Sequence, residues 1–141
     1  MAATIQVEIV SAEEEIWSGE GTMVFAPGSS GELGIAPRHT PLITQLKAGD
    51  VRVELESGEQ QFFFITGGLL EVQPHLVTVL SDTAMRGDDL DEDAAQAAMK
   101  QAEERLKDKS MEDKDYQDMK AELAAYAAQI RAIEKLKKLR S

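Results

Sequence analysis

Residues 76–106 read LVTVLSDTAMRGDDLDEDAAQAAMKQAEERL, and the spacing of the apolar residues changes within this stretch. Before Gly87, short apolar runs are separated by turn residues, as in strands. After Gly87, apolar residues return every three or four positions, which is the period of a helix. We therefore expect two parts, residues 1–87 and residues 88–141.

The first part shows the period of strands. Ile5–Ile9 and Val51–Leu55 alternate apolar with polar residues, so each has one buried face. Ser57-Gly58 and Gly67-Gly68 mark turns between further runs. About seven to ten short strands without intervening helices predict an antiparallel β-sandwich, and a small closed barrel fits the same periodicity. The further runs lie at 23–25, 41–46, 62–65, 69–72 and 76–80.

The second part predicts two helices. Asp89 with Glu92 three residues later has the form of a capping box, and the surrounding acids suit a helix N-terminus. An alanine-rich helix follows, with Ala95, Met99, Ala102 and Leu106 on one stripe, and it fades at 108–110. The stripe of the second helix comprises Tyr116, Met119, Leu123, Tyr126, Ile130, Ile133, Leu136 and Leu139.

A short link between two such helices favours an antiparallel hairpin. The fold class is therefore α+β, a sandwich followed by a helical hairpin. The alanine-rich stripe of the first helix buries little apolar area, while ordering the backbone costs about 1–2 kcal/mol per residue. We expect the hairpin to need a partner surface.

Composition narrows the functional classes. The net charge of −11 disfavours nonspecific binding to nucleic acid. The absence of cysteine removes disulfides and thiolate metal sites, and fits a reducing compartment. No apolar run approaches the roughly 20 residues that span a bilayer, and the N-terminus lacks the pattern of a signal peptide. We expect a soluble protein without direct membrane insertion.

Local motifs give little sign of catalysis. The glycines of residues 28–34 invite a phosphate-loop interpretation, but no Lys-Ser or Lys-Thr follows and Glu32 would repel a phosphate. We expect an ordered turn between strands there. His39 and His75 belong to no metal-ligand cluster, so no metal site is predicted. We expect no catalytic residues in this chain.

The C-terminal end is basic. From Gln129 onward it carries Arg131, Lys135, Lys137, Lys138 and Arg140 against Glu134 alone, a local charge of +4. Cations stabilise a helix C-terminus by roughly 0.3–1 kcal/mol each, which is one interpretation. A docking strip for an acidic partner is the other.

Several motifs in order resemble the epsilon subunit of bacterial F-type ATP synthases over the whole chain. They are Val10-Ser-Ala-Glu13, Gly31-Glu-Leu-Gly-Ile35 followed by Pro37 and His39-Thr-Pro-Leu42, Gly67-Gly-Leu-Leu-Glu-Val-Gln-Pro74, and Val77-Thr-Val-Leu-Ser-Asp-Thr-Ala84. The resemblance implies a non-catalytic central-stalk subunit that couples proton flow to ATP synthesis. It places the chain peripherally on the cytoplasmic side of the bacterial inner membrane.

The resemblance also implies partners for each part. The sandwich would bind the gamma subunit and the ring of c subunits. The c-ring contact turn would comprise Glu32, Leu33, Gly34, Pro37, Arg38 and His39, with Arg38 in place of a frequent glycine. The hairpin would extend toward the catalytic α/β hexamer and hinder ATP hydrolysis. Its contacts there would be Arg131, Lys135, Lys137 and Lys138.

Some family members bind ATP through Ile/Leu-Asp-x-x-Arg-Ala at the start of the first helix. Here Leu90 to Ala95 matches at its ends, but Ala94 stands where the arginine belongs. Asp91 and Arg131 would be what remains of such a site. Because a phosphate partner is lost, we expect weak or absent ATP binding and no cofactor.

Two other functional classes stay open. One is a nucleotide-sensing module whose hairpin closes on ATP. The other is a free-standing sandwich adaptor unrelated to the rotary motor.

Overall fold

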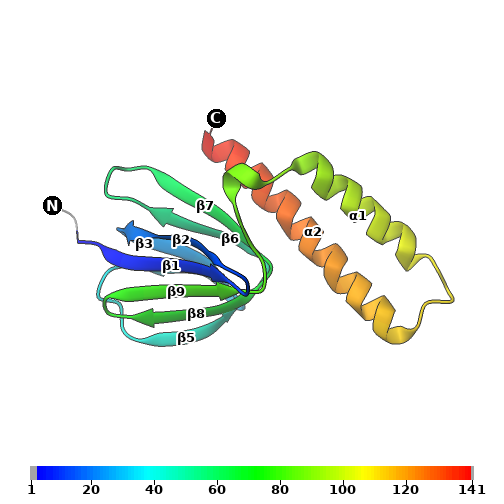
Figure 1. Ribbon diagram of the computed structural model, residues 1–141, viewed down its shortest axis with the longest axis horizontal. Helices are drawn as coiled ribbons and strands as arrows, with labels where there is room; N and C mark the ends of the chain where they lie inside the picture. Colours follow the sequence, from blue (N-terminus) through cyan, green and yellow to red (C-terminus); the bar gives the residue numbers. More distant parts are fainter. Residues whose placement is uncertain (1–2, 141) are drawn as a thin grey trace. The chain divides into compact units, whose positions relative to one another are not determined.

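The structure, a computed structural model, describes residues 3–140. Figure 1 shows strands in the first part of the chain and a pair of helices in the second. The chain forms two compact units, residues 1–89 and residues 90–141. In order the elements are β1 (Ile5–Ser11), β2 (Glu15–Gly21), β3 (Met23–Gly28), β4 (Gly31–Ile35), β5 (Leu42–Leu46), β6 (Gly49–Glu54), β7 (Gln60–Ile65), β8 (Gly68–Gln73), β9 (Leu76–Ser81), β10 (Ala84–Arg86), the 3-10 turn η1 (Gly87–Asp89), α1 (Glu92–Leu106) and α2 (Asp113–Arg140).

The strands form a sandwich. They hydrogen-bond in the order β10-β7-β6-β3-β5-β8-β9-β1-β2, and β4 pairs with β3. β3 meets β5 only where Gly28 lies opposite Leu46, so the sheet folds over at that point. Among residues 3–140 no backbone pairing joins β10 to β2. The predicted sandwich is confirmed. The strand path does not close into a barrel, because β10 and β2 are not paired.

One strand pair departs from the antiparallel pattern. β1 pairs with β9 in parallel, with Val7 opposite Val77 and Ile9 opposite Val79. A parallel pair needs a long connection, and the seven strands from β2 to β8 that lie between β1 and β9 provide it. Alternation in the sequence reports which face is buried and carries no information about strand direction.

The sandwich core follows the alternation in the sequence. Along β1 every second residue is buried, from Ile5 through Val7 and Ile9 to Ser11. The corresponding residues of the other strands complete one core cluster. Its members with no measurable exposure include Val24, Val51, Val53, Phe63, Ile65, Leu70, Val77 and Val79.

The hairpin begins later than the capping box predicted. Asp89 belongs to η1, and Asp91 caps α1 by accepting a hydrogen bond from Ala94 N to Oδ1 at 3.1 Å. Acids fill most positions from 88 to 93, so composition could not single out the cap. Asp91 is the cap because its backbone is extended, with φ −120° and ψ 108°.

The predicted helix stripes are confirmed in part and are wrong at the first and last apolar positions of α2. Ala95 and Ala102 of α1 are buried, as are Ile133 and Leu136 of α2. Tyr116 is 38% exposed and Leu139 is 47% exposed, because α2 has 28 residues and α1 only 15. Within residues 3–140 neither helix combines the length and apolar character needed to cross a bilayer.

Candidate functional site

The predicted contact turn has a rigid exposed tip. Pro37 and Arg38 form the turn after β4, and Arg38 adopts φ 64°, a left-handed conformation that glycine favours. Backbone hydrogen bonds hold it, from Arg38 N to Pro74 O at 3.2 Å and from His39 N to Ala36 O at 3.2 Å. A glycine would adopt this conformation without strain, so Arg38 occupies it at a cost in backbone strain.

The His39 ring is oriented by the same turn. Its Nδ1 lies 2.7 Å from the Thr40 carbonyl oxygen, so Nδ1 carries the proton and donates. The bond from Arg38 to Pro74 also brings in the turn between β8 and β9, where Pro74 and His75 are exposed. Sequence reasoning treated His75 only as a turn residue.

The remaining residues of the predicted turn are spread over β4. Glu32 lies on the outer face, where its Oε1 accepts a hydrogen bond from Arg52 Nη2 at 2.9 Å. Leu33 points the other way and packs against the core. Gly34 lies opposite Phe25 in the ladder with β3. Gly28 pairs with Gly31 across a turn formed by residues 29 and 30 alone, so the predicted turn between strands exists but is shorter than expected, and residues 31–34 belong to β4.

An apolar strip crosses the outer face of β5, β8 and β9. We use apolar strip for Ile43, Leu69 and Leu80, which are 71%, 43% and 47% exposed. Leu69 lies directly opposite Leu80, and Ile43 of β5 is its diagonal neighbour because Ile43 pairs with Glu71. Sequence reasoning missed this strip. The signal was present in apolar pairs such as Leu69-Leu70, which supply both faces of a strand.

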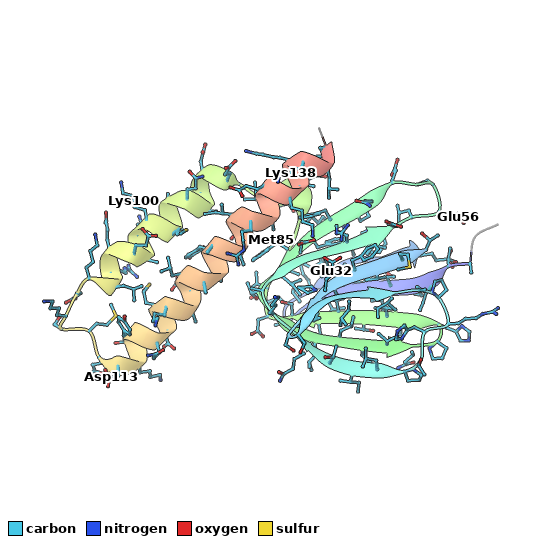
Figure 2. All side chains as sticks on the ribbon, turned by 180° about the vertical axis from the view of Figure 1, so that it is seen from behind. Glu32, Glu56, Met85, Lys100, Asp113 and Lys138 are labelled. Carbon is cyan, nitrogen blue, oxygen red and sulfur yellow. The ribbon has the colours of Figure 1, made fainter. Side chains whose placement is uncertain are left out.

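The basic residues cluster at the end of α2. Figure 2 shows Lys138 at the opposite end of the hairpin from Asp113. Lys137 forms an ion pair with Glu92 in the first turn of α1. The hydrogen bond and charge of Glu92 raise the pKa of Lys137 above its usual 10.5. Glu92 is an anion at the N-terminal end of α1 and Lys137 a cation at the C-terminal end of α2, so each charge suits the dipole of its own helix and their pairing links the two ends of the hairpin.

The two residues of the predicted ATP remnant belong to different helices. Asp91 uses its carboxylate as the N-cap of α1. Arg131 is exposed on α2, and no hydrogen bond or ion pair links the two residues within the part of the chain that the structure describes. Ala94 contributes only its backbone N–H to the cap.

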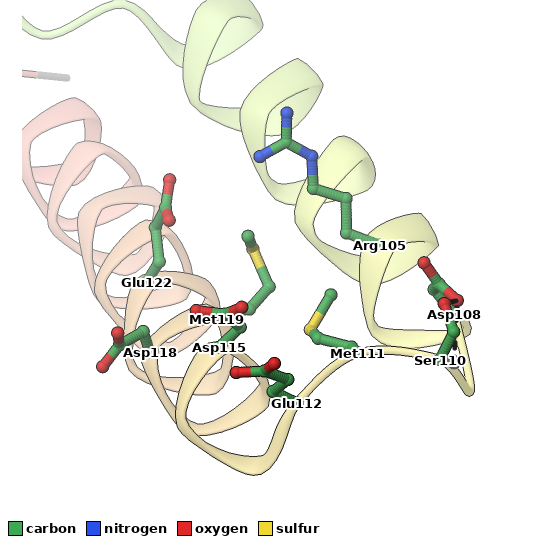
Figure 3. Close-up of a pocket in the computed structure, with 9 residues that line it drawn as sticks. All are labelled: Arg105, Asp108, Ser110, Met111, Glu112, Asp115, Asp118, Met119 and Glu122. Carbon is green, nitrogen blue, oxygen red and sulfur yellow. Dashed lines mark hydrogen bonds between the residues drawn. The ribbon is translucent and has the colours of Figure 1, made fainter.

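A cavity of about 500 Å³ opens beside the turn of the hairpin. Met111 and Met119 extend into it, with carboxylates around them (Figure 3). Two hydrogen bonds from Ser110 to Asp108 hold the turn and lower the pKa of that carboxyl. Among residues 3–140 no group of His, Asp or Glu is arranged to hold a metal ion. The other lining residues are Arg105, Glu112, Asp115, Asp118 and Glu122.

Two family models cover the chain. Residues 4–87 match the ATP synthase delta/epsilon chain β-sandwich domain, and residues 88–134 match the long alpha-helix domain of the same chain. The chain is 57% identical over 138 residues to the ATP synthase epsilon chain of Nitrosococcus oceani, which is 98% of both proteins. It is 56% identical over 137 residues to that of Delftia acidovorans, covering 97% of this chain and 99% of that one.

Solved structures share the fold at low identity. A chain in the mitochondrial ATP synthase of Euglena gracilis superposes with a TM-score of 0.81 at 20% identity, covering 94% of this chain and 83% of that chain. A chain in the central stalk and c-ring structure of Tetrahymena thermophila ATP synthase gives 0.55 at 14% identity, over 96% and 97%. At these identities the likeness concerns the fold alone.

Proposed function

The chain belongs to the ATP synthase epsilon-chain family, and on that premise we propose that it is a non-catalytic rotor subunit of the central stalk. In this role it couples proton translocation to ATP synthesis and hinders ATP hydrolysis through its C-terminal helices. It works peripherally on the cytoplasmic side of the bacterial inner membrane. The observation that carries the proposal is the match of both units, in order, to the two domains of one family.

The apolar strip is the proposed docking surface for the gamma subunit. Its three aliphatic side chains are exposed on a strand-paired and therefore rigid face. Monomeric proteins seldom leave such residues clustered in water, and clustering of this kind marks interaction surfaces. Burying one leucine is worth about 1.5–3 kcal/mol, so the strip alone supplies a substantial part of the affinity.

The turn at residues 36–41 is the proposed contact with the c ring. Hydrogen bonds donated by Arg38 N and His39 N fix the backbone of this turn. Its side chains would then contact the polar loops of the c subunits. A rigid turn loses little conformational entropy on binding. Of the residues that the resemblance implies, Pro37, Arg38 and His39 form the contact, while Leu33 supports it from the core.

The hairpin is the proposed inhibitory arm. Arg131, Lys135, Lys137 and Lys138 meet acidic residues of the α/β hexamer when the arm extends. Lys137 must then exchange Glu92 for a carboxylate of the partner. Exposed ion pairs contribute little to stability, so this exchange needs little free energy.

ATP binding by the isolated chain is proposed to be weak or absent. Asp91 is committed to capping α1, and Ala94 offers no cation to a phosphate. Isothermal calorimetry with ATP tests this point. Micromolar affinity that disappears in Arg131→Ala would favour the nucleotide-sensing module instead.

Reconstitution with α, β and gamma subunits tests the main proposal. Leu69→Lys should abolish co-purification with gamma, whereas Gln73→Lys, an equal charge change on the same face of β8, should not. A chain ending at Asp89 should still bind gamma and should relieve inhibition of ATP hydrolysis. Unchanged hydrolysis would confine the protein to coupling, and failure of the full chain to bind gamma would favour the free-standing adaptor.

A further inference from the structure

Three strands of the sandwich, β2, β4 and β10, each pair with a single neighbour within residues 3–140, and β2 is the longest of them. β2 is an end of the strand path and pairs with β1 alone within residues 3–140. At the other end of the path, β10 has only three residues and pairs with β7. β2 has seven residues and β10 only three, so β10 is too short to cover the whole outer edge of β2. Alternate N–H and C=O groups along such an edge can accept another strand.

The side chain of Arg86 links β10 to β2 along part of what we call the seam, the place where these two strands lie near each other without backbone pairing. The pairing of β1 with β2 shifts register between Ile9 and Val10, so Ile16 is the extra residue of a bulge. Arg86 Nη2 of β10 donates a hydrogen bond to Ile16 O at 2.8 Å. The guanidinium thus replaces the backbone bond that a neighbouring strand would make. Beyond Ile16, no hydrogen bond among the described residues replaces a strand along the edge from Trp17 to Glu20, whereas Gly21 is buried against Val53.

The interior behind this edge is already filled by one aromatic ring. A Cβ added to Gly19 would lie 2.7 Å from Trp17 Cζ2, so the indole folds along β2 over this glycine. The same ring lies 5.8 Å from Phe63, between ring centroids. A segment that binds here therefore pairs with the edge and leaves the core undisturbed. Trp17 is the only tryptophan in the chain, so its fluorescence is a probe of binding at the edge of β2.

The charges around the seam are mostly negative. A recess of about 310 Å³ lies there, and its carboxylates are Glu14, Glu15 and Asp89 against Arg86 alone. Glu20 adds an exposed carboxylate further along β2. A second copy of this strand would bring like charges together, which opposes edge-to-edge self-association. A basic strand would meet opposite charges.

We propose that the outer edge of β2 binds an extended basic segment of a partner polypeptide by strand addition. Along β2, Trp17 and Gly19 face the core because they pair with Ile9 and Val7, while Ser18 and Glu20 face outward. The added strand continues the same sheet, so its basic residues lie outward beside Glu20 and its inward residues are small or apolar. Main-chain hydrogen bonds supply affinity, and this alternation supplies specificity.

The test uses the full chain and the capped heptapeptide Lys-Val-Lys-Val-Lys-Val-Lys. The expected result is a saturable change in Trp17 fluorescence, together with slower hydrogen exchange at amides of β2. A second peptide with proline in place of the central valine has the same charge but cannot form a continuous ladder. It should bind at least tenfold more weakly.

Charge is tested separately on the protein. Glu20→Lys should weaken binding of the alternating peptide at least tenfold, while Glu56→Lys, an equal charge change in the exposed loop between β6 and β7, should change it less than twofold. Equal binding of the two peptides would reduce the effect to nonspecific charge attraction and overturn the proposal. No saturable change at millimolar peptide, or dimerisation of the chain in sedimentation experiments, would also overturn it.

Discussion

Replacing Gly68 by alanine should damage the sandwich far more than the same change at Gly58. Gly68 begins β8 with φ 150°, opposite Leu46 on one side and Ser81 on the other. A Cβ there would lie 1.9 Å from the Leu80 carbonyl oxygen, well inside contact distance. That oxygen belongs to β9, which is paired on both sides and cannot withdraw without breaking a ladder.

The matched control separates backbone strain from the clash. Gly58 lies in the turn between β6 and β7 with φ 93°, and a Cβ added to it meets nothing within 4 Å. Alanine in such a conformation costs about 1–3 kcal/mol, which both variants share. The displaced strand pair adds to this at Gly68. We expect a loss of about 1–3 kcal/mol for Gly58→Ala and more than about 4 kcal/mol for Gly68→Ala.

Urea denaturation followed by Trp17 fluorescence measures both losses, because the single tryptophan belongs to the sandwich. The denaturation slopes of the variants should match that of the parent, so that midpoints compare free energies of unfolding. A folded Gly58→Ala beside an unfolded Gly68→Ala would agree with the reasoning. Losses within about 1 kcal/mol of each other would refute the claim that the Leu80 carbonyl constrains this position.

Three further predictions concern hydrogen bonds and an ion pair. Ser81 is 3% exposed, and its hydroxyl lies 2.5 Å from Gly67 O and 2.8 Å from Thr83 O. Ser81→Ala should therefore lower the free energy of unfolding by about 1–3 kcal/mol in urea denaturation. A loss near zero would contradict this. Asp91→Ala removes the cap of α1 and should cost about 1 kcal/mol, seen as faster hydrogen exchange in its first turn, while unchanged exchange would count against the cap. Because folding raises the pKa of Lys137 through Glu92, the contribution of this ion pair to stability is complete below pH 10.5 and is lost as pH rises through the folded pKa. Helical ellipticity should therefore fall more steeply above pH 10.5 in the parent than in Lys137→Gln. Identical pH profiles would contradict this.

The strands were predictable where one face is buried and the other is polar. Ile5–Ile9 and Val51–Leu55 showed this pattern and form β1 and β6. β2 and β4 were missed because glycines and glutamates interrupt them, and β10 because it has only three residues. Edge strands bury less apolar area, so their sequences carry a weaker periodic signal.

The candidate site was predictable only as a set of residues. The motif from Glu32 to His39 was predicted as one contact turn, but the structure distributes its residues among an ion pair, a core contact and an exposed turn. The apolar strip could not be recognised from one strand. Its residues come from β5, β8 and β9 and become neighbours only through strand pairing.

Residue spacing alone determined the division into a sandwich and a helical hairpin, because the period of apolar residues reports which local conformation buries them. It also located the basic end of the chain and the missing arginine at Ala94. Only the tertiary structure decided the parallel pairing of β1 with β9, the choice of Asp91 as cap and the open edge of β2. These features depend on residues far apart in the chain or on the backbone angles that packing imposes, and neither is encoded in a local pattern.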